Sequence, residues 1–107
     1  MIYEVALTAK AESQLEAAFA WWAEHHSVEQ AARWYDRFGQ AIISLGKNPQ
    51  RCPQSPEADD FSFEVRDLYF GLGRKPSHRA VFVIREKLVL VIAIRHTAQR
   101  EMTPDDI

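Results

Sequence analysis

Several features are scarce in this chain of 107 residues. Cys52 is its only cysteine, so the sequence offers neither a disulfide framework nor a thiolate metal site. The longest apolar run, Leu88 to Ile94, is too short to span a bilayer. No secretion signal is apparent, because the first residues already resemble a strand. We therefore expect a cytoplasmic protein without a membrane segment, a metal or a cofactor.

Basic charge is also in short supply. The net charge is −2 and the isoelectric point is near 6.1, which is unlike a general nucleic-acid-binding surface with its strong basic stripe. The charge is uneven, however. Residues 1–60 carry five Lys/Arg against nine Asp/Glu, whereas residues 61–107 carry eight against six. A chain of this length with 47% hydrophobic residues predicts one globular domain over residues 1–107.

The first half of the sequence predicts a strand followed by a helical hairpin. Residues Ile2–Leu7 alternate as a strand does, and Thr8 is a suitable cap for a helix that continues to about residue 26. Ser27 then begins a capping box, and apolar residues recur at helical spacing from residue 28 to residue 45. Gly46 is the expected residue after the end of this helix.

The second half predicts strands. Three prolines and an acidic cluster between Asn48 and Asp60 indicate an irregular connector. Strands are expected at Phe61–Phe70, His78–Arg85 and Leu88–His96, and Glu86-Lys87 forms a tight turn between the last two. The last strand is apolar at every position up to Ile94, so both of its faces should be covered and it should lie centrally. The predicted class is α+β with the order β-α-α-β-β-β.

Three weaker motifs have simple structural explanations. The loop at residues 71–75 (GLGRK) lacks the third glycine and the following helix of a phosphate loop. The adjacent pair His25-His26 cannot face one metal from a helix, and it is typical of a helix C-terminus. Cys52 has no neighbouring base in the sequence, which favours a buried thiol.

Two hydrophobic residues fall off the apolar stripes of the helices. Trp21 lies at the edge of the first stripe and Ile43 lies outside the second. In one interpretation both helix faces pack, one on the other helix and one on the sheet. Alternatively, these side chains form an apolar surface for a partner, since exposed aromatic residues mark interfaces. The sequence leaves the two interpretations even.

A set of basic residues lies on the three predicted C-terminal strands: Arg66, Arg79, Arg95, His96 and Arg100. Neighbouring strands would bring them toward one face, where guanidinium groups bind phosphate and a histidine transfers protons. That is the composition of an RNA-cleavage site. In the alternative interpretation the arginines pair with Glu64, Asp67 and Glu101.

The order of these elements resembles the RelE/ParE superfamily, the toxins of bacterial type II toxin–antitoxin modules. The resemblance covers nearly the full length, at residues 5–22, 31–49, 63–68, 78–86 and 88–101. It implies a helical hairpin packed on a small, mainly antiparallel sheet. The long paired helices and the Ile-Arg-His ending are more similar to the ParE-like branch. Arg66 corresponds to the family's arginine on the second strand, and His96 and Arg100 to its C-terminal motif.

The resemblance implies two possible activities. RelE-like members cleave mRNA on the ribosome, and here Arg66, Arg79, His96 and Arg100 would be the catalytic candidates. ParE-like members poison DNA gyrase, for which Arg66, Arg95, His96 and Arg100 would contact the target. The tail EMTPDDI is acidic and has no tyrosine, which departs from the endonuclease pattern. A third possibility is an interaction domain of the same fold that has lost toxicity.

A toxin of this family implies a cognate antitoxin as its partner in a hetero-oligomer. The antitoxin would bind the hairpin around Trp21 and Ile43, as a helix in an apolar groove or as a strand added to a sheet edge.

Overall fold

The computed structural model describes residues 2–107 and confirms the order β-α-α-β-β-β. The elements are β1 (Glu4–Leu7), α1 (Ala9–His25), α2 (Val28–Ile43), β2 (Arg66–Phe70), β3 (His78–Arg85) and β4 (Leu88–His96). Short 3-10 helices lie at Ser44–Gly46, Pro49–Arg51, Ala58–Asp60 and Pro104–Asp106. Within residues 2–107 no helix has the length and apolarity that crossing a bilayer requires.

Both helices begin where the sequence predicts. The Thr8 hydroxyl accepts a hydrogen bond from the Ala11 N–H at 3.1 Å, and the Ser27 hydroxyl accepts one from the Gln30 N–H at 3.0 Å. Each bond satisfies an amide that the first helical turn would leave unpaired. The two caps therefore fix the point at which the chain turns back to form the hairpin.

The predicted role of Gly46 at the end of α2 is wrong. The helix passes into a 3-10 turn that includes Gly46, and the left-handed residue is Asn48, with φ of 48°. Gly46 is small because β1 approaches it closely. Its carbonyl accepts the Tyr3 N–H at 2.7 Å, and a Cβ there would lie 3.1 Å from the Tyr3 carbonyl oxygen.

The four strands form one sheet in the order β1-β4-β3-β2. β1 runs parallel to β4, and the other two pairs are antiparallel. The predicted two-residue turn joins Arg85 to Leu88, and Glu86 accommodates it with φ of 54°. β4 has a neighbour on each side, so its predicted central position is confirmed.

Two predicted strands are shorter than expected. β1 begins at Glu4, and Ile2 contributes only an isolated bridge to Lys47. β2 begins at Arg66 rather than at Phe61. The preceding segment leaves the sheet edge and crosses over one face, because Phe61 and Val65 bury their side chains there. The Val65 carbonyl is bound by the Ser55 N–H instead of by a strand.

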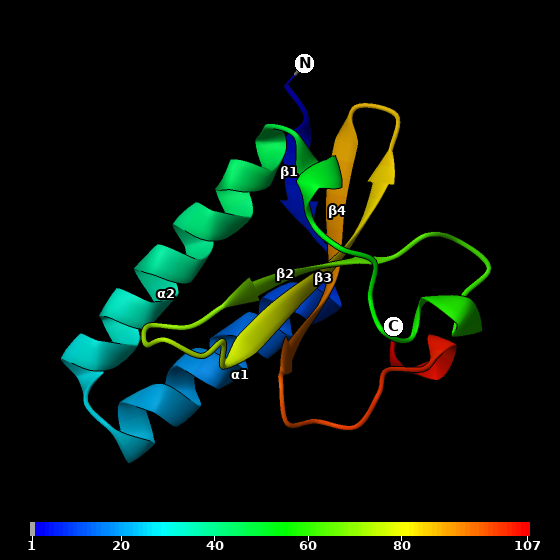
Figure 1. The fold of residues 1–107 in the computed structure, drawn as a ribbon. Coiled ribbons are helices and arrows are strands. Elements are labelled where there is room, and N and C mark those ends of the chain that lie inside the picture. The colour runs from blue at the N-terminus through cyan, green and yellow to red at the C-terminus, as the bar shows by residue number, and fades with distance from the viewer. Residues whose placement is uncertain (1) are drawn as a thin grey trace.

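A separate hydrophobic cluster covers each face of the sheet. The two helices pack on one face, around Trp34, Phe38 and Phe82. The connector and the C-terminal segment cover the other face, where Val65 and Met102 are fully buried. Figure 1 shows this division, with the helices on one side and the green connector and red C-terminus on the other. Both faces of β4 are covered, as its apolar sequence predicts.

Candidate functional site

Arg66 begins β2, and its guanidinium group is engaged by its own surroundings. Its Nε donates to Glu64 Oε1 at 2.8 Å, and its Nη1 donates to the backbone carbonyls of Gln50 and Cys52. The side chain keeps 19% of its surface exposed. Arg66 therefore links the connector to the start of β2 through these hydrogen bonds.

Arg79 lies in a buried ionic cluster on the face opposite the helices. Its two Nη atoms donate to both carboxylate oxygens of Glu57, at 2.7 and 2.6 Å, and to Asp67 Oδ2 at 2.7 Å. Glu57 also accepts the Met102 N–H at 2.7 Å. Burial raises the pKa of Glu57, but the hydrogen bonds from Arg79 and Met102 outweigh it and hold the pKa at about 2. The cluster ties the connector, β2, β3 and the tail together.

Arg95 and Arg100 are joined to the C-terminal segment. Arg95 is only 6% exposed, its Nη2 donates to the Arg100 carbonyl at 2.8 Å, and its Nε has no partner among residues 2–107. Arg100 is exposed and forms a two-pronged bond to Asp106, at 2.9 and 2.8 Å. The predicted pairing of arginines with local carboxylates is confirmed for Arg66–Glu64 and Arg79–Asp67. Arg100 binds the carboxylate of Asp106 and only the backbone carbonyl of Glu101.

His96 is exposed at the end of β4, and its ring is oriented by the backbone that follows. Its Nδ1 accepts the Ala98 N–H at 3.0 Å, so the neutral ring carries its proton on Nε2. The neighbouring His78 ring lies 5.0 Å away between centroids. Burial, and secondarily the His96 charge, lower the pKa of His78 to about 4. His78 is therefore neutral near pH 7.

The predicted convergence of the basic residues on one sheet face is wrong. Arg79 and Arg95 are register partners on the helix-free face, whereas alternation along the strands puts Arg66 and His96 on the helix face. On the helix face, His96 is paired with His78 of β3, and His78 is paired with Phe70 of β2. Arg66 lies four residues before Phe70 along β2. Four residues of strand correspond to ~13 Å. The groups thus occupy separate surfaces.

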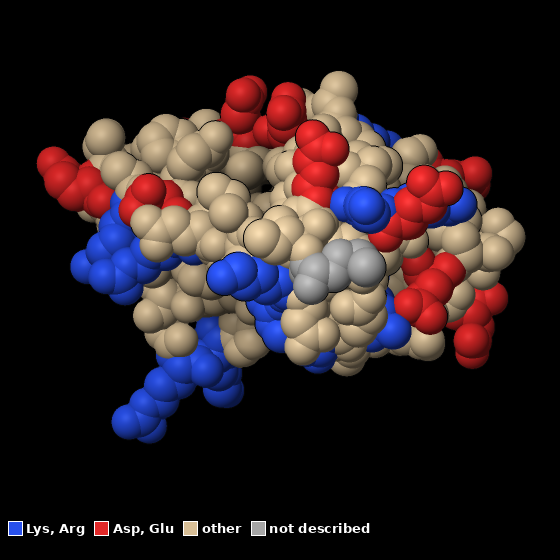
Figure 2. Space-filling view, turned by 90° about the horizontal axis from the view of Figure 1, so that it is seen from above, with Lys and Arg blue, Asp and Glu red and all other residues tan. Residues whose placement is uncertain are grey.

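Charges of both signs are also mixed on the surface of the molecule that Figure 2 draws. Figure 2 shows one face, on which blue Lys/Arg and red Asp/Glu side chains both occur with uncharged surface between them. A site for a phosphate backbone needs several cations within reach of one strand of nucleic acid. The predicted basic residues do not provide such a row.

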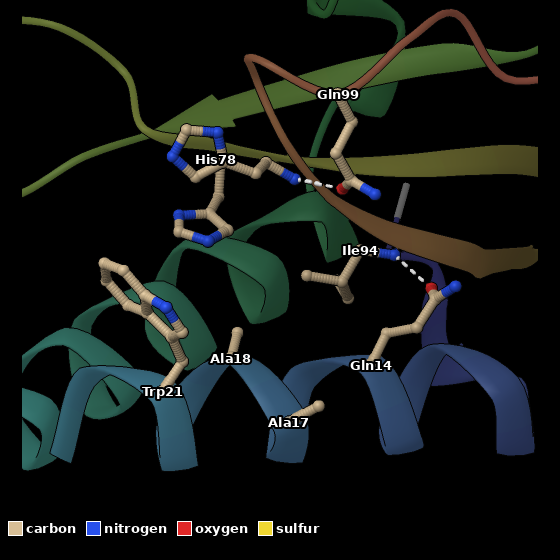
Figure 3. A pocket seen from close by; sticks show the side chains of 8 residues that line it. Gln14, Ala17, Ala18, Trp21, His78, Ile94 and Gln99 are labelled. Carbon is tan, nitrogen blue, oxygen red and sulfur yellow. Dashed lines mark hydrogen bonds between the residues drawn. The ribbon is translucent and has the colours of Figure 1, made fainter. Parts of the chain in front are cut away.

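The structure contains a hollow of about 460 Å³ between α1 and the end of β4, which the sequence does not predict. Trp21 lines its helical side and His78 lines its sheet side (Figure 3). His96 also lines the hollow. Gln14 and Gln99 complete its polar lining, and none of the Lys, Arg, Asp or Glu side chains in residues 2–107 lines it. The hollow is thus an uncharged, partly aromatic surface.

The two glutamines in this hollow accept hydrogen bonds from backbone N–H groups at the unpaired edge of β4. β1 ends at its pairing with Val91, so beyond this point β4 has no neighbouring strand on that side in the described part of the chain. The Ile94 N–H donates to Gln14 Oε1 at 2.8 Å and the His96 N–H donates to Gln99 Oε1 at 2.7 Å, as Figure 3 shows. Side-chain amides therefore replace the carbonyls of an absent strand.

The predicted partner-binding residues are both at the surface. Trp21 is 48% exposed and Ile43 is 71% exposed, whereas Trp34 is fully buried against the sheet. Trp21 borders the hollow beside β4, and Ile43 borders a second hollow beside β1. They lie near opposite ends of the antiparallel hairpin, so one small contact cannot cover both.

The remaining motifs have structural roles. Cys52 is buried, and burial raises the pKa of its thiol, which disfavours the reactive thiolate. His25 Nδ1 bonds to the Trp21 carbonyl at 2.9 Å at the end of α1. Over residues 2–107, no three His, Cys, Asp or Glu side chains gather as a metal ion would need.

Sequence reasoning missed Glu57, Gln14 and His78. Glu57 belongs to an acidic connector whose composition indicates exposure to solvent, and Gln14 occupies a polar position of α1. His78 opens a strand and looks like an edge residue. No local signal marks any of them, because each acts through a residue that is distant in the sequence.

Comparison with known proteins agrees with the architecture. Among solved structures, the chain is similar to one titled "Chromosomal ParDE TA system from P. aeruginosa". The TM-score is 0.70 and the identity 17%, over 89% of this chain and 96% of that one, so the likeness concerns the fold. No curated protein matches the chain in sequence. A family model described as the ParE toxin of the type II toxin–antitoxin system parDE matches residues 5–101. Since this match spans most of the sequence, the chain belongs to the ParE toxin family of type II toxin–antitoxin systems.

Proposed function

We propose that this chain arrests bacterial growth by poisoning DNA gyrase in the cytoplasm, and that a cognate antitoxin neutralises it by binding the helical hairpin. Family membership supports the toxin role. The observation that carries the choice of target is the state of the basic residues. Arg66, Arg79 and Arg100 are each bound to carboxylates of the same chain, and they do not surround a common point.

RNA cleavage would require a different arrangement. The reaction needs a base for the 2′-hydroxyl, an acid for the leaving oxygen and cations around the phosphate. His96 is the exposed candidate for proton transfer, and the Ala98 N–H already occupies its Nδ1. Its nearest ionisable neighbour, His78, is buried and neutral. These features favour a protein-binding toxin over a nuclease.

Gyrase binding requires only a complementary surface. Of the four predicted target contacts, His96 and Arg100 are exposed at the end of β4, whereas Arg95 is buried and Arg66 lies elsewhere. We therefore narrow the proposed gyrase contact to His96, Arg100 and the loop between them. Arg95 supports this loop through its bond to the Arg100 carbonyl.

A growth assay in cells and two assays on the purified protein test the proposal. Expression of the chain alone should arrest growth, and co-expression with the neighbouring antitoxin gene should restore it. The purified protein should trap gyrase–DNA cleavage complexes and leave mRNA on translating ribosomes intact. Codon-phased mRNA cuts with unaffected gyrase would establish the nuclease instead. Unimpaired growth in every case would mean that the chain is a non-toxic interaction domain.

Surface variants locate the gyrase contact. Arg100→Glu should reduce trapping of gyrase while changing stability little, because solvent screens an ion pair at an exposed arginine. Arg74→Glu makes the same charge change in the exposed loop after β2 and serves as the control. Equal trapping by both variants would remove Arg100 from the contact.

A further inference from the structure

The last residues of the chain form an acidic segment that folds back onto the protein. Residues 101–107 contain three Asp or Glu and no Lys or Arg. Met102 is fully buried, and its N–H donates to Glu57 Oε2 at 2.7 Å, which anchors the segment. A 3-10 turn at Pro104–Asp106 follows, drawn in red in Figure 1. Negative charge is thereby held close to the arginines at the end of β4.

Asp106 binds Arg100 from this turn. Its two carboxylate oxygens accept hydrogen bonds from the two terminal nitrogens of the guanidinium group, at 2.9 and 2.8 Å. The same carboxylate holds its own turn together, because Oδ2 also accepts the Thr103 N–H at 2.8 Å. The Arg100 side chain nevertheless keeps 67% of its surface exposed. This two-pronged geometry is the one in which arginine recognises the carboxylates of other molecules.

Asp106 also supplies negative charge to Arg95. Arg95 is 6% exposed, and among residues 2–107 its Nε has no hydrogen-bond partner and its guanidinium group forms no ion pair. Burial lowers the pKa of Arg95, and Asp106 is the strongest of the charges that oppose this shift. Two arginines therefore depend on one carboxylate of the terminal turn.

We propose that Arg100, with Arg95 beneath it, is a binding site for an acidic segment of the toxin's protein target, and that the C-terminal turn occupies this site in the free toxin as an internal competitor. The inference rests on the proposed function and adds a means of regulation to it. On binding, a carboxylate of the target takes the place of Asp106 and restores the charge beside Arg95. The present occupant is a carboxylate carried by a peptide turn, so a peptide partner fits the site directly.

Removal of the competing charge tests the proposal. Asp106→Asn keeps the size of the side chain and weakens its bond to Arg100, so the toxin concentration for half-maximal trapping of gyrase should fall about threefold. Asp105→Asn makes the same change at the neighbouring exposed position, which forms no ion pair among residues 2–107, and should leave that concentration nearly unchanged. High salt should reduce the difference between the two variants.

Thr103→Ala separates opening of the turn from the change of charge. In the capping box of the turn, the Thr103 hydroxyl accepts the Asp106 N–H and donates to the Asp106 carboxylate at 3.3 Å. Its loss should loosen the turn without altering any charge. Trapping of gyrase should therefore improve again, and hydrogen exchange of the Asp106 amide in the free protein should accelerate.

A double-mutant cycle tests whether Asp106 acts through Arg100. Arg100→Gln removes the cation for which the tail and the target compete. The gain from Asp106→Asn should therefore largely disappear when it is combined with Arg100→Gln. A gain of equal size in both backgrounds would show that Asp106 acts elsewhere, which would overturn the proposed competition.

The outcomes separate this regulation from the proposed function. Improved trapping by Asp106→Asn and Thr103→Ala, with Asp105→Asn unchanged, supports the internal competitor. Unchanged or weaker trapping by both variants, in a protein that still arrests growth, overturns it and leaves the toxin role intact. Equal gains from Asp106→Asn and Asp105→Asn reveal a general effect of charge and also overturn it. If neither the original protein nor any variant traps gyrase, the proposed function is refuted and the regulation with it.

Discussion

At Arg79, a guanidinium group that the sequence offers as a catalytic candidate is enclosed by two carboxylates. Glu57 binds it through both oxygens, and Asp67 accepts a further hydrogen bond from Nη1. Asp67 also accepts hydrogen bonds from the Ser55 and Tyr69 hydroxyls. Such a cluster tolerates burial only while every member is present, since one unpaired buried charge costs several kcal/mol.

Replacement of Arg79 should therefore destabilise the fold. We expect Arg79→Met to lower the free energy of unfolding by about 3–5 kcal/mol, because Glu57 and Asp67 would remain buried without a counter-charge. Urea unfolding followed by circular dichroism measures the change. Arg74→Met, in an exposed loop, should change it by no more than about 0.5 kcal/mol. An unaltered unfolding midpoint for Arg79→Met would show that the cluster does not form. If this variant loses toxicity, the loss of stability explains it, and a catalytic role for Arg79 does not follow.

At the scale of elements, β4 is longer than β1, and a side chain of α1 binds a backbone amide of β4 that β1 does not reach. β4 extends beyond its last pairing with β1, and the exposed edge would attract another strand. Gln14 on α1 accepts the Ile94 N–H and blocks that edge at the point where the helix crosses it. A residue on a helix thus completes the hydrogen bonding of a strand.

Removal of this acceptor should loosen the end of β4. Gln14→Leu should cost about 1–3 kcal/mol and accelerate hydrogen exchange of the Ile94 amide, because that N–H would lose its partner away from water. Gln14→Glu keeps a carboxylate oxygen in reach and should retain most of the protection. Gln40→Leu on the exposed side of α2 is the matched control. Unchanged exchange at Ile94 in Gln14→Leu would show that the edge is protected in another way.

At the scale of the whole molecule, two buried ionisable groups make folding sensitive to acid in adjoining pH ranges. Burial and the neighbouring His96 lower the pKa of His78 from 6.5 to about 4, so its contribution is complete above pH 6.5 and disappears toward pH 4. The pKa of Glu57 falls from 4.5 to about 2, so its contribution is lost between these values. Each shift corresponds to about 3 kcal/mol.

The free energy of unfolding should therefore decline continuously as the pH falls from about 6.5 to 2.5, first through His78 and then through Glu57. His78→Phe keeps a ring against Trp34 and removes the titration, so its profile should be flatter between pH 6.5 and 4 whatever its stability at neutral pH. His25→Phe makes the same substitution at an exposed position and is the control. Urea titrations across this range give the measurement, and parallel profiles for all three proteins would contradict the assignment to His78.

Much of the fold followed from the sequence alone. Thr8 and Ser27 cap the helices through residues only three positions away, and the apolar run of β4 requires cover on both faces. The two-residue turn at Glu86-Lys87 is fixed by the lengths of the adjoining strands. These features depend on local spacing and composition, which the sequence states directly.

Only the tertiary structure decided how the candidate groups are used. Register and strand alternation separate Arg66 and His96 from Arg79 and Arg95. The partner of Arg79 is 22 positions away at Glu57, and Ile94 finds its acceptor 80 positions away at Gln14. Such pairings arise when loops and helices settle over a sheet, because burial forces each polar group to find whichever partner lies within reach. A sequence specifies which groups need partners, and the packed chain selects the partners.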